Sequence, residues 1–143
     1  MFLPEFQLLL YCARSRPASG PIKRLVDRSA IDWGKLLALA DQHCVRPLLL
    51  QSLKAVCWDA VPTSFRLELD GFCKSNAQKN LLLAGELLRL LRNFNESEVP
   101  VVAFKGPILA EAVYGDLSLR EFCDLDLLIR GQDLTRAEDI RLW

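Results

Sequence analysis

The spacing of the apolar residues changes near residue 99, and this change restricts the folds that the chain can adopt. Before it, apolar residues recur every three or four positions, which is the spacing of a buried helix face. Residues 99–104 then form a continuous, valine-rich run, and residues 124–129 form a second apolar run that carries acids at alternate positions. Such runs predict strands, and residues 107–114 between them have a helical pattern. We therefore predict an α+β protein, with a helical N-terminal region followed by a helix–strand–helix–strand core.

The apolar spacing before residue 99 predicts helices separated by short loops. Helices are expected over residues 4–13, 32–44, 47–58 and 62–94. Asp32 is a suitable N-cap for the second of them. Gly71 favours an interruption of the last, because glycine lowers helix propensity by about 1 kcal/mol. Residues 14–21 are rich in Ser, Pro and Gly and predict a loop, and a further helix is expected from Leu134. The expected buried stripe of the long helix consists of Leu81, Ala84, Leu87, Leu88, Leu91 and Phe94.

These patterns divide the chain into a helical N-terminal region, residues 1–74, and a partial α+β core, residues 75–143. A sheet of two strands is marginal by itself, so a third strand is expected and the chain looks truncated. The strand edge left open after Ile129 invites pairing with another copy of the chain, which would give a homo-oligomer.

Charge and composition limit the classes of function. The 18 basic and 18 acidic side chains cancel, so no extended nucleic-acid surface is expected. The five cysteines are scattered and form no metal-type pair, which favours reduced thiols and a cytoplasmic location. No stretch approaches the roughly 18 apolar residues of a membrane span. His43 is the only histidine, and it ends an amphipathic helix, so we expect it to pack or to interact with the helix terminus rather than to bind a ligand.

The two acids of the second run, Asp124 and Asp126, predict a metal site. In a strand, residues two apart point to the same face, so these carboxylates would lie side by side. Two like charges held together cost free energy unless a cation neutralises them, and carboxylate oxygens suit Mg²⁺. Metal ions in such a site stabilise phosphoryl displacement. The alternative is a solvent-facing pair on an edge strand, although the apolar neighbours favour a buried strand.

The turn between the first strand and the following helix predicts a phosphate site. Gly106 lets the backbone approach a ligand, and the N-terminus of the helix that begins at Pro107 favours an anion. Lys105 adds a positive charge, and Arg120 could neutralise the acids or grip a phosphate. The alternatives are an ordinary strand-to-helix turn with an exposed lysine and a structural salt bridge for Arg120.

The run V-V-A-F-K-G-P-I-L-A-E-x-x-Y-G-D-x-x-L-R-x-F-x-D-L-D-L-L-I, within residues 100–129, resembles the bacterial family of uncharacterised nucleotidyltransferases. That family belongs to the DNA polymerase β-type nucleotidyltransferase superfamily. The resemblance implies a nucleotidyltransferase-like core with Mg²⁺ on Asp124 and Asp126 and the triphosphate on the turn at Gly106. Lys105 and Arg120 match the sequence pattern of this branch of the superfamily. The wider superfamily has Gly or Ser after its turn glycine and a third carboxylate on a later strand, and this chain lacks both.

The function expected from the resemblance is a Mg²⁺-dependent nucleotidyltransferase that moves a nucleoside monophosphate from an NTP to an unknown acceptor, either a small molecule or a protein. Without the third carboxylate, this chain is expected to turn over slowly or not at all. The main alternative is a non-catalytic, nucleotidyltransferase-like module for regulation or protein interaction, such as an antitoxin-like partner. A structural helical domain with a coincidental acid pair is the third hypothesis.

Overall fold

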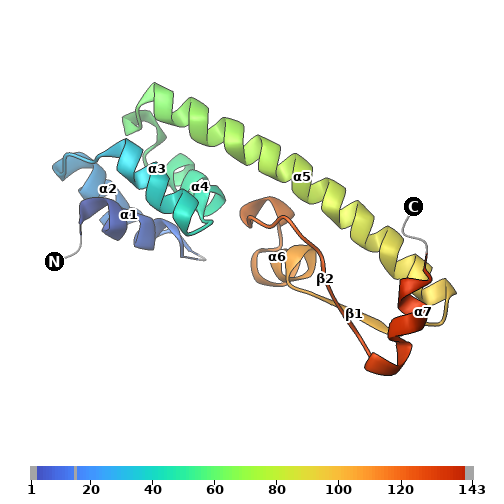
Figure 1. Ribbon diagram of the computed structural model, residues 1–143. Coiled ribbons are helices and arrows are strands. Elements are labelled where there is room, and N and C mark those ends of the chain that lie inside the picture. The colour runs from blue at the N-terminus through green and yellow to red at the C-terminus, as the bar shows by residue number, and fades with distance from the viewer. Residues whose placement is uncertain (1–2, 15, 141–143) are drawn as a thin grey trace. The chain divides into compact units, whose positions relative to one another are not determined.

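The computed structural model describes residues 3–14 and 16–140, which form two compact units (Figure 1). The first unit consists of Met1–Ala77 together with Ser118–Glu121, and the second of Gln78–Leu117 together with Phe122–Trp143. Helix α5, Thr63–Glu96, contributes its first part to one unit and its second part to the other. Among the described residues, no helix is both long and apolar enough to cross a membrane.

The first unit is a bundle of helices around one apolar core. It contains α1 (Pro4–Cys12), α2 (Ser19–Arg28), α3 (Trp33–Gln42), α4 (Arg46–Val56), the short helix η1 (Trp58–Ala60) and the start of α5. α1, α3, α4 and α5 each contribute residues three or four positions apart on one buried face, and α2 contributes Ile22. The core side chains are Leu8, Leu9, Cys12, Ile22, Leu36, Ala40, Leu49, Leu53, Val61, Phe65, Leu69 and Cys73.

The predicted helices at residues 4–13, 32–44 and 47–58 are confirmed with small shifts in their ends. The predicted loop at residues 14–21 is wrong over its last part, because α2 begins at Ser19. Pro21 lies in the first turn of α2, where the missing N–H of proline has no helical partner to lose. His43 follows α3 and is exposed, with its ring 6.2 Å from that of Phe6.

Asp32 caps α3 as predicted, since its Oδ1 accepts a hydrogen bond of 3.0 Å from the backbone N–H of Lys35. We expect Asp32→Ala to lower the free energy of unfolding by about 1 kcal/mol, because that N–H loses its acceptor. The hydrogen bond from the backbone N–H of Asp32 to Glu5 Oε1, at 3.1 Å, does not depend on the aspartate side chain. Urea denaturation followed by circular dichroism measures the change. The exposed Asp59 supplies the control: an equal loss in Asp59→Ala would contradict a capping effect.

Helix α5 is continuous over 34 residues, so the predicted interruption at Gly71 is wrong. Gly71 is exposed, and a Cβ atom there would meet no atom within 4 Å, so packing does not require a glycine at this position. The predicted apolar stripe is also partly wrong. Leu87 and Phe94 are buried, whereas the side chains of Leu81 and Leu88 are 68% and 57% exposed.

The second unit contains the strands. Its elements are β1 (Val101–Phe104), α6 (Gly106–Tyr114), β2 (Asp126–Ile129), the short helix η3 (Gly131–Asp133) and α7 (Leu134–Glu138), and a short helix η2 (Leu117–Leu119) lies where the chain passes between the units. The predicted order of helix, strand, helix, strand and helix is confirmed. The buried apolar side chains of the second unit are Leu87, Leu90, Phe94, Val99, Ala110 and Phe122. The end of the last predicted helix, at residues 141 and 142, lies outside the described residues.

The two strands pair antiparallel. Val101 pairs with Ile129 at one end of the ladder, and Phe104 pairs with Asp126 at the other. β2 therefore begins two residues later than the predicted strand at residues 124–129, and Asp124 lies outside it. The physical reason is that β1 ends at Phe104, so no residue of β1 is left to pair with Asp124.

Candidate functional site

The antiparallel register brings the predicted phosphate turn and the predicted acids to the same end of the sheet. Phe104, the last residue of β1, pairs with Asp126, the first residue of β2. Lys105 and Gly106 follow β1 at the point where residues 124 and 125 precede β2. A Cβ atom at Gly106 would lie 3.4 Å from the carbonyl oxygen of Asp124 and 4.0 Å from Leu125 Cδ2. The turn therefore packs directly against the segment that carries the acids.

The backbone of the turn has an unusual conformation. Gly106 has φ +43°, and Lys105 has φ 56° and ψ −148°. These values lie in regions that side-chain-bearing residues seldom adopt, and a non-glycine residue held there stores strain of order 1–3 kcal/mol. Such strain is typical of residues whose position serves a site. Lys105 also precedes the first residue of α6 as its N-cap, so the turn leads directly into a helix N-terminus.

The first turn of α6 offers backbone donors. The first N–H groups of any helix lack helical acceptors, and Pro107 at the second position has no N–H at all. The N-cap residue, Lys105, makes no side-chain cap hydrogen bond. At the other end, Gly115 adopts the left-handed conformation (φ 64°), and its N–H donates to the carbonyl oxygen of Glu111. α6 thus has a conventional end and an N-terminus that suits an anion.

Asp126 and Lys105 form the charged contact of this site. Lys105 Nζ lies 3.7 Å from Asp126 Oδ2, and the two side chains are 57% and 31% exposed. The ammonium also lies 5.1 Å from the centre of the Phe104 ring, which is close enough for a cation–π interaction. Asp124 is exposed and precedes the strand. The two acids therefore differ: Asp126 is held in the ladder, and Asp124 lies in the extended segment against Gly106.

The donor chemistry of this pair fits a magnesium ion. Mg²⁺ prefers oxygen ligands, keeps several waters and usually takes only one or two protein carboxylates. Within residues 3–14 and 16–140, no group of three or more His, Cys, Asp or Glu side chains is placed to hold a metal. Asp124 and Asp126, beside the turn, supply two carboxylates, which is within the one or two that a protein usually gives Mg²⁺.

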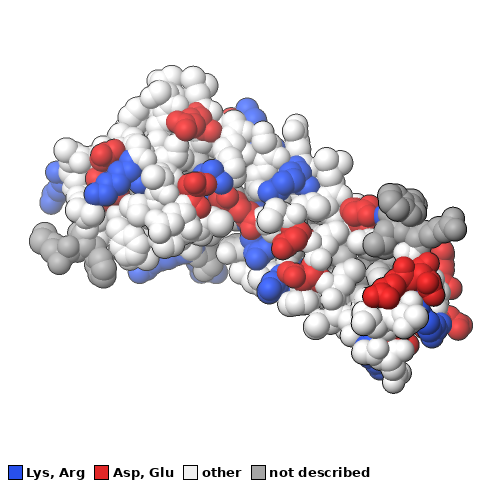
Figure 2. Space-filling model, in the orientation of Figure 1, with Lys and Arg blue, Asp and Glu red and all other residues white. Residues whose placement is uncertain are grey.

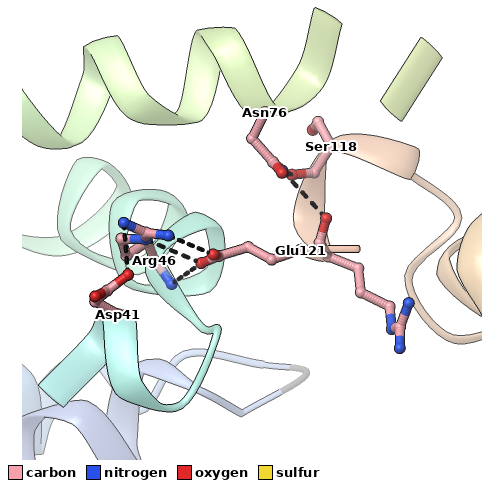
Figure 3. Close-up of polar contacts among 6 residues, drawn as sticks. Asp41, Arg46, Asn76, Ser118 and Glu121 are labelled. Carbon is pink, nitrogen blue, oxygen red and sulfur yellow. Dashed lines mark hydrogen bonds and ion pairs between the residues drawn. The ribbon is translucent and has the colours of Figure 1, made fainter. Parts of the chain in front are cut away.

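Arg120, the third predicted phosphate ligand, lies in the Ser118–Glu121 segment of the first unit. Its backbone carbonyl oxygen accepts a hydrogen bond of 3.1 Å from Asn76 Nδ2, and that of Ser118 accepts from the same group at 3.4 Å (Figure 3). In the second unit, Asn80 Nδ2 donates to the carbonyl oxygen of Leu117 at 2.7 Å. The two asparagines hold the backbone that leads to the acids, and the role of the Arg120 side chain stays a prediction.

An ion pair joins Arg46 and Glu121, both in the first unit (Figure 3). The Glu121 carboxylate accepts three hydrogen bonds from Arg46: from Nη2 at 2.7 Å, from Nε at 3.2 Å and from the Arg46 backbone N–H at 3.1 Å. Arg46 Nη1 also contacts Asp41 Oδ1 at 2.8 Å, and its guanidinium lies 3.2 Å from the centre of the Phe72 ring. The hydrogen bonds to Glu121 raise the pKa of Arg46 above its ordinary value. This pair anchors the segment immediately before the acids.

Sequence reasoning missed Arg46, Glu121, Asn76 and Asn80. A signal existed for the asparagines, because they are one helical turn apart and in register with Phe65, Leu69, Leu87 and Phe94 on the buried face of α5. A polar residue on such a face predicts a hydrogen-bond partner. No local signal marks Arg46 and Glu121, which are 75 residues apart. On the face drawn in Figure 2, the described basic and acidic side chains are interspersed, as their equal numbers predict.

A comparison with known protein families agrees with the residues of this site. The family described as uncharacterised nucleotidyltransferase matches residues 29–141, which include the turn, both acids and most of the helical region. The chain therefore belongs to the uncharacterised nucleotidyltransferase family, and the resemblance seen in residues 100–129 is confirmed. Neither a search of curated proteins nor a search of solved structures found a match.

Proposed function

We propose that this chain binds an NTP together with Mg²⁺ and transfers the nucleoside monophosphate to an acceptor. Family membership supports a nucleotide substrate. The observation that carries the proposal is the contact between the turn and the acids, where a Cβ atom at Gly106 would lie 3.4 Å from the Asp124 carbonyl oxygen. A phosphate at the turn would thus be within reach of a metal ion on the carboxylates.

Gly106 and Lys105 bind the phosphates in this proposal. The absence of a side chain at Gly106 lets a phosphate oxygen approach the backbone N–H groups at the start of α6, where the helix dipole favours negative charge. Lys105, the residue before the helix, neutralises part of the triphosphate charge with its mobile ammonium group. Arg120 belongs to the first unit, and its part in binding stays a prediction from the sequence.

Asp124 and Asp126 hold the metal in this proposal. A bound Mg²⁺ would neutralise charge that develops on the phosphate oxygens during transfer. Asp126 is fixed by the β1–β2 ladder, whereas Asp124 is fixed by the packing of its backbone against Gly106. In the reaction, an acceptor oxygen forms a bond to the α-phosphorus, and the bond from that phosphorus to the bridging oxygen breaks. Pyrophosphate leaves with the electron pair, and the proton of the acceptor passes to solvent.

Isothermal titration with ATP in the presence of Mg²⁺ tests the binding step. We expect the unmodified chain to bind, and Asp124→Asn and Asp126→Asn each to weaken binding at least about tenfold. Even loss of a group that merely supports a metal ligand costs 10- to 100-fold in many sites. Asp59→Asn, which removes an exposed acid from η1 in the first unit, is the matched control and should bind normally.

Two results would contradict the proposal. One is a failure of the unmodified chain to bind any of the four common NTPs with Mg²⁺. The other is unchanged binding by both acid variants. Binding without release of pyrophosphate, across a panel of hydroxyl-bearing acceptors, would instead favour the non-catalytic, antitoxin-like alternative.

A further inference from the structure

We propose that Lys105 is a built-in substitute for the metal ion and that it discriminates between free Mg²⁺ and Mg²⁺ that carries a nucleotide. In the ligand-free chain, its ammonium group neutralises Asp126. When a metal–nucleotide complex arrives, the ammonium moves from the carboxylate to the triphosphate. This inference rests on the proposed function, since it concerns how the same site discriminates between a free cation and a cation that carries phosphates.

The first evidence is the position of the ammonium group. A carboxylate is stabilised by a nearby cation, and Lys105 Nζ lies 3.7 Å from Asp126 Oδ2. The ammonium therefore occupies space beside the carboxylate that a metal ligand must expose. The contact with the Phe104 ring, at 5.1 Å, adds a second attraction toward this end of the sheet.

The second evidence is the place from which the side chain starts. Lys105 is the N-cap residue of α6, so its main chain stands at the helix N-terminus where the phosphates are proposed to bind, while its ammonium reaches the carboxylate. A lysine has four rotatable side-chain bonds and behaves as a mobile point charge. Rotation about these bonds can move the charge between the carboxylate and an anion at the helix N-terminus without movement of the backbone.

The third evidence is the exposure of the pair. Lys105 is 57% exposed and Asp126 is 31% exposed, so water and salt weaken their attraction. A divalent ion readily displaces the Lys105 ammonium from so exposed a pair, because its double charge doubles the attraction to the carboxylate. Lys105 thus competes with free Mg²⁺ and cooperates with the phosphates of an NTP, two effects of opposite sign from one residue.

Titration calorimetry on the full chain with two probes, Mg²⁺ alone and ATP at saturating Mg²⁺, tests the proposal. Lys105→Gln removes the charge and keeps a similar length. We expect it to bind Mg²⁺ about two- to fivefold more tightly than the unmodified chain, the size of one exposed ion pair, and to bind ATP about tenfold more weakly, the loss of one charge-assisted contact. Lys105→Arg keeps the charge and should leave the affinity for Mg²⁺ close to that of the unmodified chain.

The exposed Lys79, on the part of α5 that belongs to the same unit, supplies the control, and Lys79→Gln should change neither affinity. An affinity for Mg²⁺ that is unchanged or lower in Lys105→Gln, while the unmodified chain still binds ATP with Mg²⁺, would overturn the role of Lys105 and leave the proposed function standing. Failure of both the unmodified chain and Lys105→Gln to bind either probe would overturn the proposed function and this inference with it. Circular dichroism of each variant confirms that it is folded.

Discussion

Replacement of Arg46 by leucine is expected to lower the free energy of unfolding by about 3 kcal/mol, the largest loss of stability that we predict. The carboxylate of Glu121 is only 9% exposed, and two of its three hydrogen bonds from Arg46 come from the guanidinium. Removal of one partner of a buried ion pair leaves an uncompensated charge, which costs about 3–5 kcal/mol. We expect a loss at the low end of this range because the Arg46 side chain is 20% exposed and the backbone N–H of residue 46 still donates to Glu121.

A double-mutant cycle separates the ion pair from simple packing. Since Arg46→Leu combined with Glu121→Leu leaves no buried charge, we expect the double variant to recover most of the lost stability. Arg24→Leu, at an exposed position of α2, is the control and should change the free energy of unfolding by less than about 0.5 kcal/mol. Guanidinium denaturation measures four variants: Arg46→Leu, Glu121→Leu, the double variant and Arg24→Leu. A loss below about 1 kcal/mol in Arg46→Leu would mean that the pair contributes no more than a surface salt bridge.

The second large effect is expected at Gly106. A Cβ atom there would lie 3.4 Å from the carbonyl oxygen of Asp124, at the short end of ordinary contact, and any side chain at φ +43° strains the backbone. The methyl groups of Gly106→Val extend further toward that carbonyl and also occupy the space in which a phosphate would approach the backbone. We therefore expect Gly106→Val to weaken binding of ATP with Mg²⁺ by about tenfold or more, which corresponds to loss of about one charge-assisted hydrogen bond.

Gly115 provides a matched control for the backbone effect. Its φ of +64° is positive, like the φ of +43° at Gly106, but a Cβ atom at Gly115 would meet no atom within 4 Å. Both valine variants should lose about 1–2 kcal/mol of stability from the left-handed backbone. Only Gly106→Val should also lose nucleotide affinity. Equal affinities of the two variants, measured by titration calorimetry, would show that the turn does not contact the nucleotide.

Much of the candidate site could be predicted because its parts are local in sequence. The strand, the turn and the helix around Lys105 and Gly106 follow from a valine run that meets Gly-Pro, and both acids stand within one short apolar run. Their adjacency depends on the register of β1 with β2, which local patterns do not specify. The register also shows that the predicted start of the second strand was wrong, since Asp126 is in the ladder and Asp124 is not.

Local sequence patterns were enough to predict the features that depend on neighbours within about four residues. These are the helical spacing of α1, α3 and α4, the cap at Asp32 and the turn between β1 and α6 at Gly106. The contacts between distant segments could be seen only in the folded chain. Asn76 donates to the carbonyl oxygens of residues 118 and 120, and Arg46 pairs with a glutamate 75 residues away. Such pairs leave no local pattern, because a buried polar group requires a partner but does not specify where along the chain that partner lies.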